Sequence, residues 1–129
     1  MNIGKAAKLS NLTIKAVRYY ANIGLVKPQQ NIFSGYRQYT NEEVAKLKFI
    51  GKARKFDFSI NECKELLSLY EDKNRTSKEV KKITLEKIIQ IDIKLKDLND
   101  LRKELSFLAS NCHGDDKPNC PILDELSKN

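Results

Sequence analysis

TIKAVRYYANIG, residues 13–24, combines the start of a short helix, a basic face and a helix stop. Thr13 is of the residue type that caps helix N-termini, and Gly24 is of the type that ends helices. These signals predict a helix over residues 14–22. Upstream lies a shorter apolar stripe that stops at the turn signal Ser10-Asn11; its members are Ile3, Ala6, Ala7 and Leu9. Two short helices across a tight turn are typical of a helix-turn-helix.

Downstream, residues 27–40 have the composition of a small hairpin. Ser34-Gly35 is a turn signal, and residues 36–39 alternate like a short strand. A hairpin that follows a helix-turn-helix is a wing. We then expect a third helix capped by Asn41, with Glu42 and Glu43 at its positive end, and a fourth helix that starts at Ser59 or Asn61.

The charge of the chain is concentrated at one end. The net charge is +7, yet residues 1–56 hold eleven Lys or Arg and only two acidic residues, while the remainder is slightly acidic. A solubilising surface usually mixes the two signs. Excess positive charge confined to one segment therefore favours a polyanionic partner, most commonly the phosphate backbone of a nucleic acid.

Residues 77–110 contain neither Pro nor Gly and predict one long helix. From Ile88 to Leu108 its apolar residues recur at steps of three and four, close to a heptad seam with one slip near Leu98 and Leu101. A helix of this length, about 50 Å at 1.5 Å per residue, cannot be covered by so small a chain. A second copy is the simplest partner. Packing against the chain's own globular part is the alternative.

The rest of the composition restricts the class of protein. No apolar run approaches the roughly 18 residues of a membrane span, and residues 1–10 lack the apolar core of a signal peptide. We therefore expect a cytoplasmic protein without a membrane partner. The three cysteines, an odd number, argue against a disulfide framework.

Cys112 and Cys120 flank a turn-rich loop. Such a loop can bring both thiols to one point, and two thiolates suit a soft monovalent ion: Cu(I), Ag(I) or Au(I). Zn(II) takes about four ligands, and only His113, Asp115 and Asp116 are locally available to complete such a set. A disulfide or a pair of uninvolved cysteines remains an alternative. Cys63 lies on an apolar helix face, which favours a buried small side chain over a ligand.

Several of these segments together resemble the MerR (mercury-resistance regulator) family. The resemblance rests on residues 3–7, 13–20 and 24–26, and on the wing motif Gly35-Tyr36-Arg37-Gln38-Tyr39. Thr84 to Lys87 and the loop Cys112-x-Gly114-Asp115-x-x-x-Cys120-Pro121-Ile122 resemble the copper-efflux-regulator branch. The likeness covers essentially the whole chain. Three residues depart from it: Ala21 stands where the family usually has Glu, and Ile32 and Phe33 stand where the family commonly has basic or polar wing residues.

The resemblance implies a mainly α fold in three parts: a winged helix-turn-helix with hinge helices (residues 1–70), a dimerisation helix (77–110), and a metal-binding loop with a short helix (111–129). The long helices of a homodimer would form an antiparallel coiled coil. Cys112 and Cys120 would bind one Cu(I), with Ag(I) and Au(I) as alternatives. Ser77 stands where divalent-metal members carry a cysteine, and it would approach the metal from the other subunit, with Lys81 one turn on.

Lys15, Arg18 and Tyr19 are expected in the major groove, where the guanidinium fork of Arg18 can span two acceptors of guanine. A second set is expected to hold phosphates and set register: Tyr20, Tyr36, Arg37 and Arg54. For Tyr20 and Tyr36, packing inside the domain or the wing is the alternative. In this family, metal binding distorts the promoter spacer and aligns its two elements for RNA polymerase.

Three other functions compete. A divalent-metal or redox sensor could use the same scaffold, although Ser77 argues against it. A metal-independent DNA-binding protein would leave the cysteine loop without a role. An enzyme is disfavoured, because the only histidine follows Cys112 directly, and adjacent residues rarely place a base and a thiol correctly.

Overall fold

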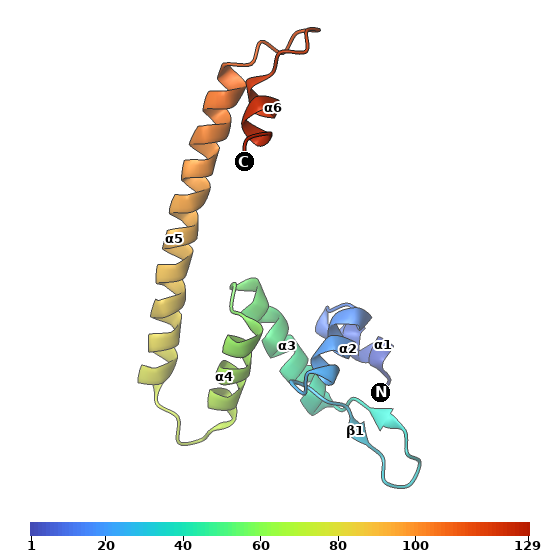
Figure 1. Ribbon diagram of the computed structural model, residues 1–129. Helices are drawn as coiled ribbons and strands as arrows, with labels where there is room; N and C mark the ends of the chain where they lie inside the picture. The colour runs from blue at the N-terminus through green and yellow to red at the C-terminus, as the bar shows by residue number, and fades with distance from the viewer. The chain divides into compact units, whose positions relative to one another are not determined.

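The computed structural model describes residues 1–129 and is mainly helical, as predicted (Figure 1). The chain forms two compact units, Met1–Lys82 and Ile83–Asn129. The elements are α1 (Ile3–Ser10), α2 (Ile14–Asn22), β1 (Gln29–Gln30), β2 (Arg37–Gln38), α3 (Asn41–Lys55), α4 (Ile60–Glu71), α5 (Ser77–Ser110) and α6 (Pro121–Leu126).

The first unit is a helix-turn-helix supported by α3. Helix α1 packs against both α2 and α3, and α3 packs against α4. The centre of this unit is apolar, and its most deeply buried large side chains are Leu47, Ile50, Val17, Val26 and Cys63. Because Val17 is fully buried, the opposite face of α2 is left to solvent, which is the arrangement a recognition helix requires.

The turn between α1 and α2 is fixed by local hydrogen bonds. Asn11 adopts the left-handed conformation (φ 58°), and the backbone N–H of Leu12 donates to the carbonyl of Ala7 at 2.9 Å. The Thr13 hydroxyl accepts a hydrogen bond from the Ala16 N–H at 3.0 Å. The prediction that Thr13 caps the second helix is therefore confirmed.

The wing is a small antiparallel hairpin in which Gln29 pairs with Gln38 and Gln30 pairs with Arg37. Its strands are shorter than the alternation of residues 36–39 predicted. Tyr39 leaves the hairpin to pair with the N-terminus: its N–H donates to the Met1 carbonyl at 2.7 Å, and the Met1 ammonium donates to the Tyr39 carbonyl at 2.8 Å. The Tyr39 ring is buried, so the wing is anchored in the core of the unit.

Helix α3 is capped by Thr40, and the prediction that Asn41 caps it is wrong. A capping box between Thr40 and Glu43 decides the position. The Thr40 N–H donates to a Glu43 carboxylate oxygen at 2.8 Å, the Thr40 hydroxyl bonds to the same oxygen, and the Gln29 side chain donates to the other at 2.9 Å. Glu43 thus ties β1 to the start of α3.

Replacing Glu43 with glutamine should lower the free energy of unfolding by about 1–2 kcal/mol at neutral pH, because a charged acceptor is lost. Burial alone would raise the pKa of Glu43, but the hydrogen bonds from Thr40 and Gln29 outweigh it and lower the pKa below its usual 4.5. The carboxylate therefore stabilises the fold above that pH, and this contribution is lost as pH falls through the lower folded pKa. Urea unfolding at stepped pH measures this; a difference that persists well below pH 4 would contradict it.

Helix α4 begins after Ser59, the first of the two predicted starts. Ser59 accepts a hydrogen bond from the Glu62 N–H at 3.1 Å, and the Glu62 carboxylate accepts one from the Ser59 N–H at 2.8 Å. Cys63 is fully buried on this helix, as its apolar setting predicted. The rings of Phe49 and Tyr70 lie 5.3 Å apart and join α3 to α4.

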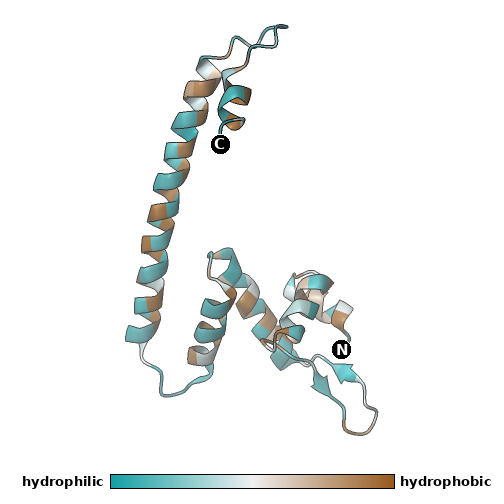
Figure 2. Ribbon diagram, in the orientation of Figure 1, coloured by the Kyte–Doolittle hydropathy of each residue, from teal (hydrophilic) through white to brown (hydrophobic).

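The long helix has the predicted bounds. Figure 2 shows hydrophobic residues recurring along α5, and many of them are exposed in the single chain. The exposed apolar residues of this helix are Leu85, Ile88, Ile89, Ile93, Leu95, Leu98, Leu101, Leu105 and Phe107. No helix combines the length and the hydropathy needed to cross a membrane.

Candidate nucleic-acid interface and thiol loop

The exposed face of α2 carries the three residues predicted to read bases. Lys15, Arg18 and Tyr19 share one side of the helix, at spacings of three and four residues, and all are exposed. Val17 and Tyr20 occupy the opposite, buried side. This division leaves the three side chains on the solvent side and able to enter a groove, with the Tyr19 ring 5.9 Å from that of the buried Tyr20.

The wing contributes a second cationic position beside α2. Arg37 and Tyr36 are exposed on the hairpin, and Tyr36 keeps 73% of its surface accessible. Burial raises the pKa of the Tyr39 hydroxyl, and the nearby Arg37 and Arg18 oppose that shift. The buried Tyr39 therefore lies in the field of both guanidinium groups, one from the wing and one from α2.

A surface hollow connects the end of α2 to the hairpin. It is lined by Ala21, Asn22, Lys27, Pro28, Gln30 and Arg37. Two cations in a mostly polar hollow next to a recognition helix match the chemistry of a backbone phosphate. No sequence pattern marks Lys27 or Tyr39 as site residues, because the fold is what brings them beside α2.

Two predicted phosphate contacts have partners inside the unit. The Tyr20 ring is buried, and burial raises the pKa of its hydroxyl against the opposing effect of the Arg54 guanidinium beside it. Arg54 also donates to the Phe58 carbonyl at 2.8 Å. The pair joins α2 to the end of α3, so packing accounts for the Tyr20 ring, while Arg54 keeps an exposed position.

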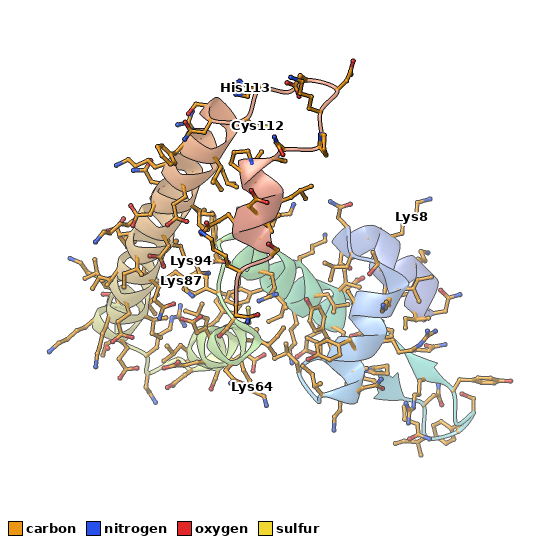
Figure 3. All side chains as sticks on the ribbon, turned by 45° about the horizontal axis from the view of Figure 1, so that its top comes forward. Lys8, Lys64, Lys87, Lys94, Cys112 and His113 are labelled. Atoms are coloured by element: carbon orange, nitrogen blue, oxygen red, sulfur yellow. The ribbon has the colours of Figure 1, made fainter.

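The second candidate site is the loop between α5 and α6 (Figure 3). Its two sulfur atoms lie together: the Cys112 thiol donates to the Cys120 sulfur across 3.9 Å. Both residues are half-buried and neither is in a disulfide. Gly114 allows the reversal of the chain with a left-handed φ of 61°, and Asp115 accepts a turn hydrogen bond from the Lys117 N–H at 2.9 Å.

The surroundings of Cys120 lower the pKa of its thiol. This residue occupies the N-cap position of α6, which begins at Pro121. The Leu123 N–H is the main cause that lowers the pKa of Cys120, assisted by the Ile122 N–H and the Cys112 thiol and opposed by burial and by Asp124. A thiolate is the form that ligates a metal.

The donors that gather in this loop are the two sulfurs. The structure contains no group of three or more His, Cys, Asp or Glu side chains that could hold a metal ion. His113 lies next to Cys112 and is exposed, as are Asp115 and Asp116. Ser77 and Lys81 lie in the first turns of α5, and both are exposed.

Comparison with known protein families identifies the family of this chain. Residues 1–70 match the model of the MerR HTH family regulatory proteins, and residues 44–108 match the MerR DNA-binding model. The chain belongs to the MerR family. The resemblance noted in the sequence and the predicted winged helix-turn-helix with a long helix are thereby confirmed. As a MerR-family member, the protein is a DNA-binding transcription regulator and not an enzyme.

Relatives named as HTH-type transcriptional regulators match along almost the whole chain. The regulator HmrR of Rhizobium leguminosarum bv. viciae is 47% identical over 98% of this chain and 98% of its own length. The regulator CueR of Salmonella typhimurium is 43% identical over 98% of this chain and 92% of its own. Among solved structures, the regulator PbrR691 of Ralstonia metallidurans, in complex with lead(II), superposes with a TM-score of 0.82 at 28% identity, covering 98% of this chain and 99% of that one.

Proposed function

We propose that this MerR-family protein is a cytoplasmic, Cu(I)-responsive activator of a copper-efflux or detoxification promoter. The observation that carries the proposal is the convergence of Cys112 and Cys120, with sulfurs 3.9 Å apart and a lowered pKa at Cys120. Two thiolates are the donor set that soft monovalent ions take. Ag(I) and Au(I) suit the same donors. The identities of 47% and 43% to HmrR and CueR support the same branch of the family.

The residues around Cys112 and Cys120 would balance the charge of the bound metal and its two thiolates. Bound Cu(I) would supply one positive charge between two thiolates, which leaves a net charge of −1. The N–H groups at the start of α6 already face Cys120 and oppose that charge. Ser77 and Lys81 lie at the other end of α5 from Cys112, so Ser77 of the partner subunit, with its Lys81, would complete the surroundings of the metal.

The protein acts as a homodimer in this proposal. The apolar residues that α5 leaves exposed would pack against a second α5 in an antiparallel coiled coil. The chain then has three functional segments: residues 1–70 bind DNA, 77–110 dimerise and 111–129 sense the metal. Each winged unit would read one half of a palindromic promoter.

On DNA, Lys15, Arg18 and Tyr19 would read bases in the major groove, while Tyr36, Arg37 and Arg54 would hold phosphates and Tyr20 would pack inside the unit. A change in the loop and in α6 would alter the angle between the two winged units. The promoter spacer would be bent and undertwisted, which aligns its two elements for RNA polymerase.

In vitro transcription tests the proposal. The DNA is a promoter that carries a site selected by the purified protein from a random library. Anaerobic addition of Cu(I) or Ag(I) should raise transcription, whereas Zn(II) and Pb(II) should not, and a competing chelator should report about one Cu(I) bound per chain. Activation by Pb(II) or Zn(II) alone would assign a divalent sensor, the metal class bound to PbrR691. A response to no metal would leave a metal-independent DNA-binding protein.

A further inference from the structure

The tip of the wing exposes two large apolar side chains. Ile32 is 93% exposed and Phe33 is 98% exposed, more than any other large apolar side chain of the protein. They lie in the loop that joins β1 to β2, which projects beyond the helices of the first unit (Figure 1). Adjacent exposed apolar side chains in an otherwise polar segment indicate a contact surface.

The tip has a defined shape in the absence of any partner. The Asn31 side-chain oxygen accepts hydrogen bonds from the N–H groups of Phe33 at 2.8 Å and Ser34 at 3.1 Å. The Asn31 N–H donates to the Tyr36 carbonyl at 2.9 Å, and the Gly35 N–H donates to the Asn31 carbonyl at 2.9 Å. These bonds fix the turn that presents Phe33, so little conformational entropy is lost when the tip binds.

The surface next to the tip is the proposed DNA interface. Tyr36 and Arg37 lie on the same hairpin, and Arg37 acts with Arg18 of α2 on the buried Tyr39 hydroxyl. The hairpin lies beside the end of α2, because Arg37 lines the same hollow as Ala21 and Asn22, in the segment that holds eleven Lys or Arg and two acidic residues. When α2 occupies a major groove, a hairpin on its flank meets the neighbouring phosphate backbone and the minor groove beyond it. DNA is the partner that this position and charge favour.

We propose that Phe33, with Ile32, is an apolar wedge that enters the minor groove beside each half-site and partly unstacks one base step. Apolar side chains inserted in this way kink DNA. The wedge rests on the proposed function, because it adds to the same spacer deformation. Sites with a flexible pyrimidine–purine step at that position would be preferred, since such steps unstack most easily.

Three variants test the wedge: Phe33→Ser removes it, Phe33→Leu keeps it apolar, and Phe56→Ser is the matched control, another phenylalanine that is 58% exposed in the same unit. The probe is a duplex selected by the wild-type protein, with 2-aminopurine placed in turn at each flanking position. Binding of the wild-type protein should raise 2-aminopurine fluorescence at one flanking step. Phe33→Ser should abolish that rise and weaken binding about fivefold to tenfold. Phe33→Leu and Phe56→Ser should stay near wild type.

The salt dependence separates a wedge from a charge effect. Apolar contacts release no counterions, so Phe33→Ser should leave the slope of affinity against salt unchanged.

Equal affinity and equal fluorescence for wild type and Phe33→Ser would overturn the proposal. Unchanged DNA binding by Phe33→Ser together with reduced transcription would also overturn it, because the tip would then be a contact for RNA polymerase. Phe33→Ser should still bind Cu(I), whereas a wild-type protein that selects no DNA would contradict the proposed function itself.

Discussion

Serine in place of Cys112 or Cys120 should abolish Cu(I)-dependent transcription and leave operator binding unchanged. Each substitution removes one of the two sulfurs that lie 3.9 Å apart, and the remaining thiol offers a single soft donor. Removing a partner that merely orients a metal ligand costs roughly 10- to 100-fold in affinity, so losing the ligand itself should cost more than about 100-fold. Anaerobic competition with a Cu(I) chelator measures this loss.

Cys63→Ala is the matched control for these variants. The Cys63 thiol is fully buried in the first unit, with the Phe58 carbonyl 3.9 Å from its sulfur. We expect this variant to bind Cu(I) as the wild type does. The assignment of the metal site fails if Cys63→Ala loses Cu(I) or if either loop variant still responds to it.

Alanine at position 18 should weaken binding to the selected operator by about 2–6 kcal/mol per dimer, since one bidentate arginine–guanine contact discriminates by about 1–3 kcal/mol and two half-sites are read. Arg18 is exposed on α2, so the substitution leaves the core intact. Fluorescence anisotropy should be measured on the selected duplex and on one with the contacted guanine replaced by adenine. Arg18→Ala should bind the two duplexes almost equally.

Arg37→Ala should weaken DNA binding without the loss of base discrimination expected for Arg18→Ala. Arg37 lies on the wing in a polar hollow and is proposed to hold a phosphate. The substitution should weaken binding to all sequences alike and reduce the salt slope by about 1 for each phosphate that is no longer neutralised. If Arg18→Ala behaved in this way instead, Arg18 would be a phosphate contact, and base reading would have to come from Lys15 or Tyr19.

Local signals were enough to predict several elements. The bounds of α2 and α5 follow from residues close in sequence: the Thr13 cap begins α2, and the lack of Pro and Gly keeps α5 continuous. The pairing of Cys112 with Cys120 was predictable because turn residues separate them within one short loop. The lower pKa of Cys120 was not, because it depends on where α6 begins.

Contacts between distant residues were not predictable. The cap at Thr40 is local, since Thr40 and Glu43 have the T-x-x-E spacing of a capping box, but the hydrogen bond from Gln29 to the Glu43 carboxylate joins distant residues. The contact of Tyr20 with Arg54 likewise joins two helices, and no periodic pattern links the positions. Strand β2 ends before Tyr39 because Tyr39 pairs with Met1, which is distant from it in the sequence.

The exposed apolar residues of α5 link the stability of the protein to its concentration in the cell. In the proposed homodimer, burying them depends on meeting a second chain, so stability would follow mass action and rise with protein concentration. A freshly made chain carries this exposed face until it finds a partner. In that assembly, the abundance of the regulator would set how much of it is dimeric before any metal or promoter is encountered.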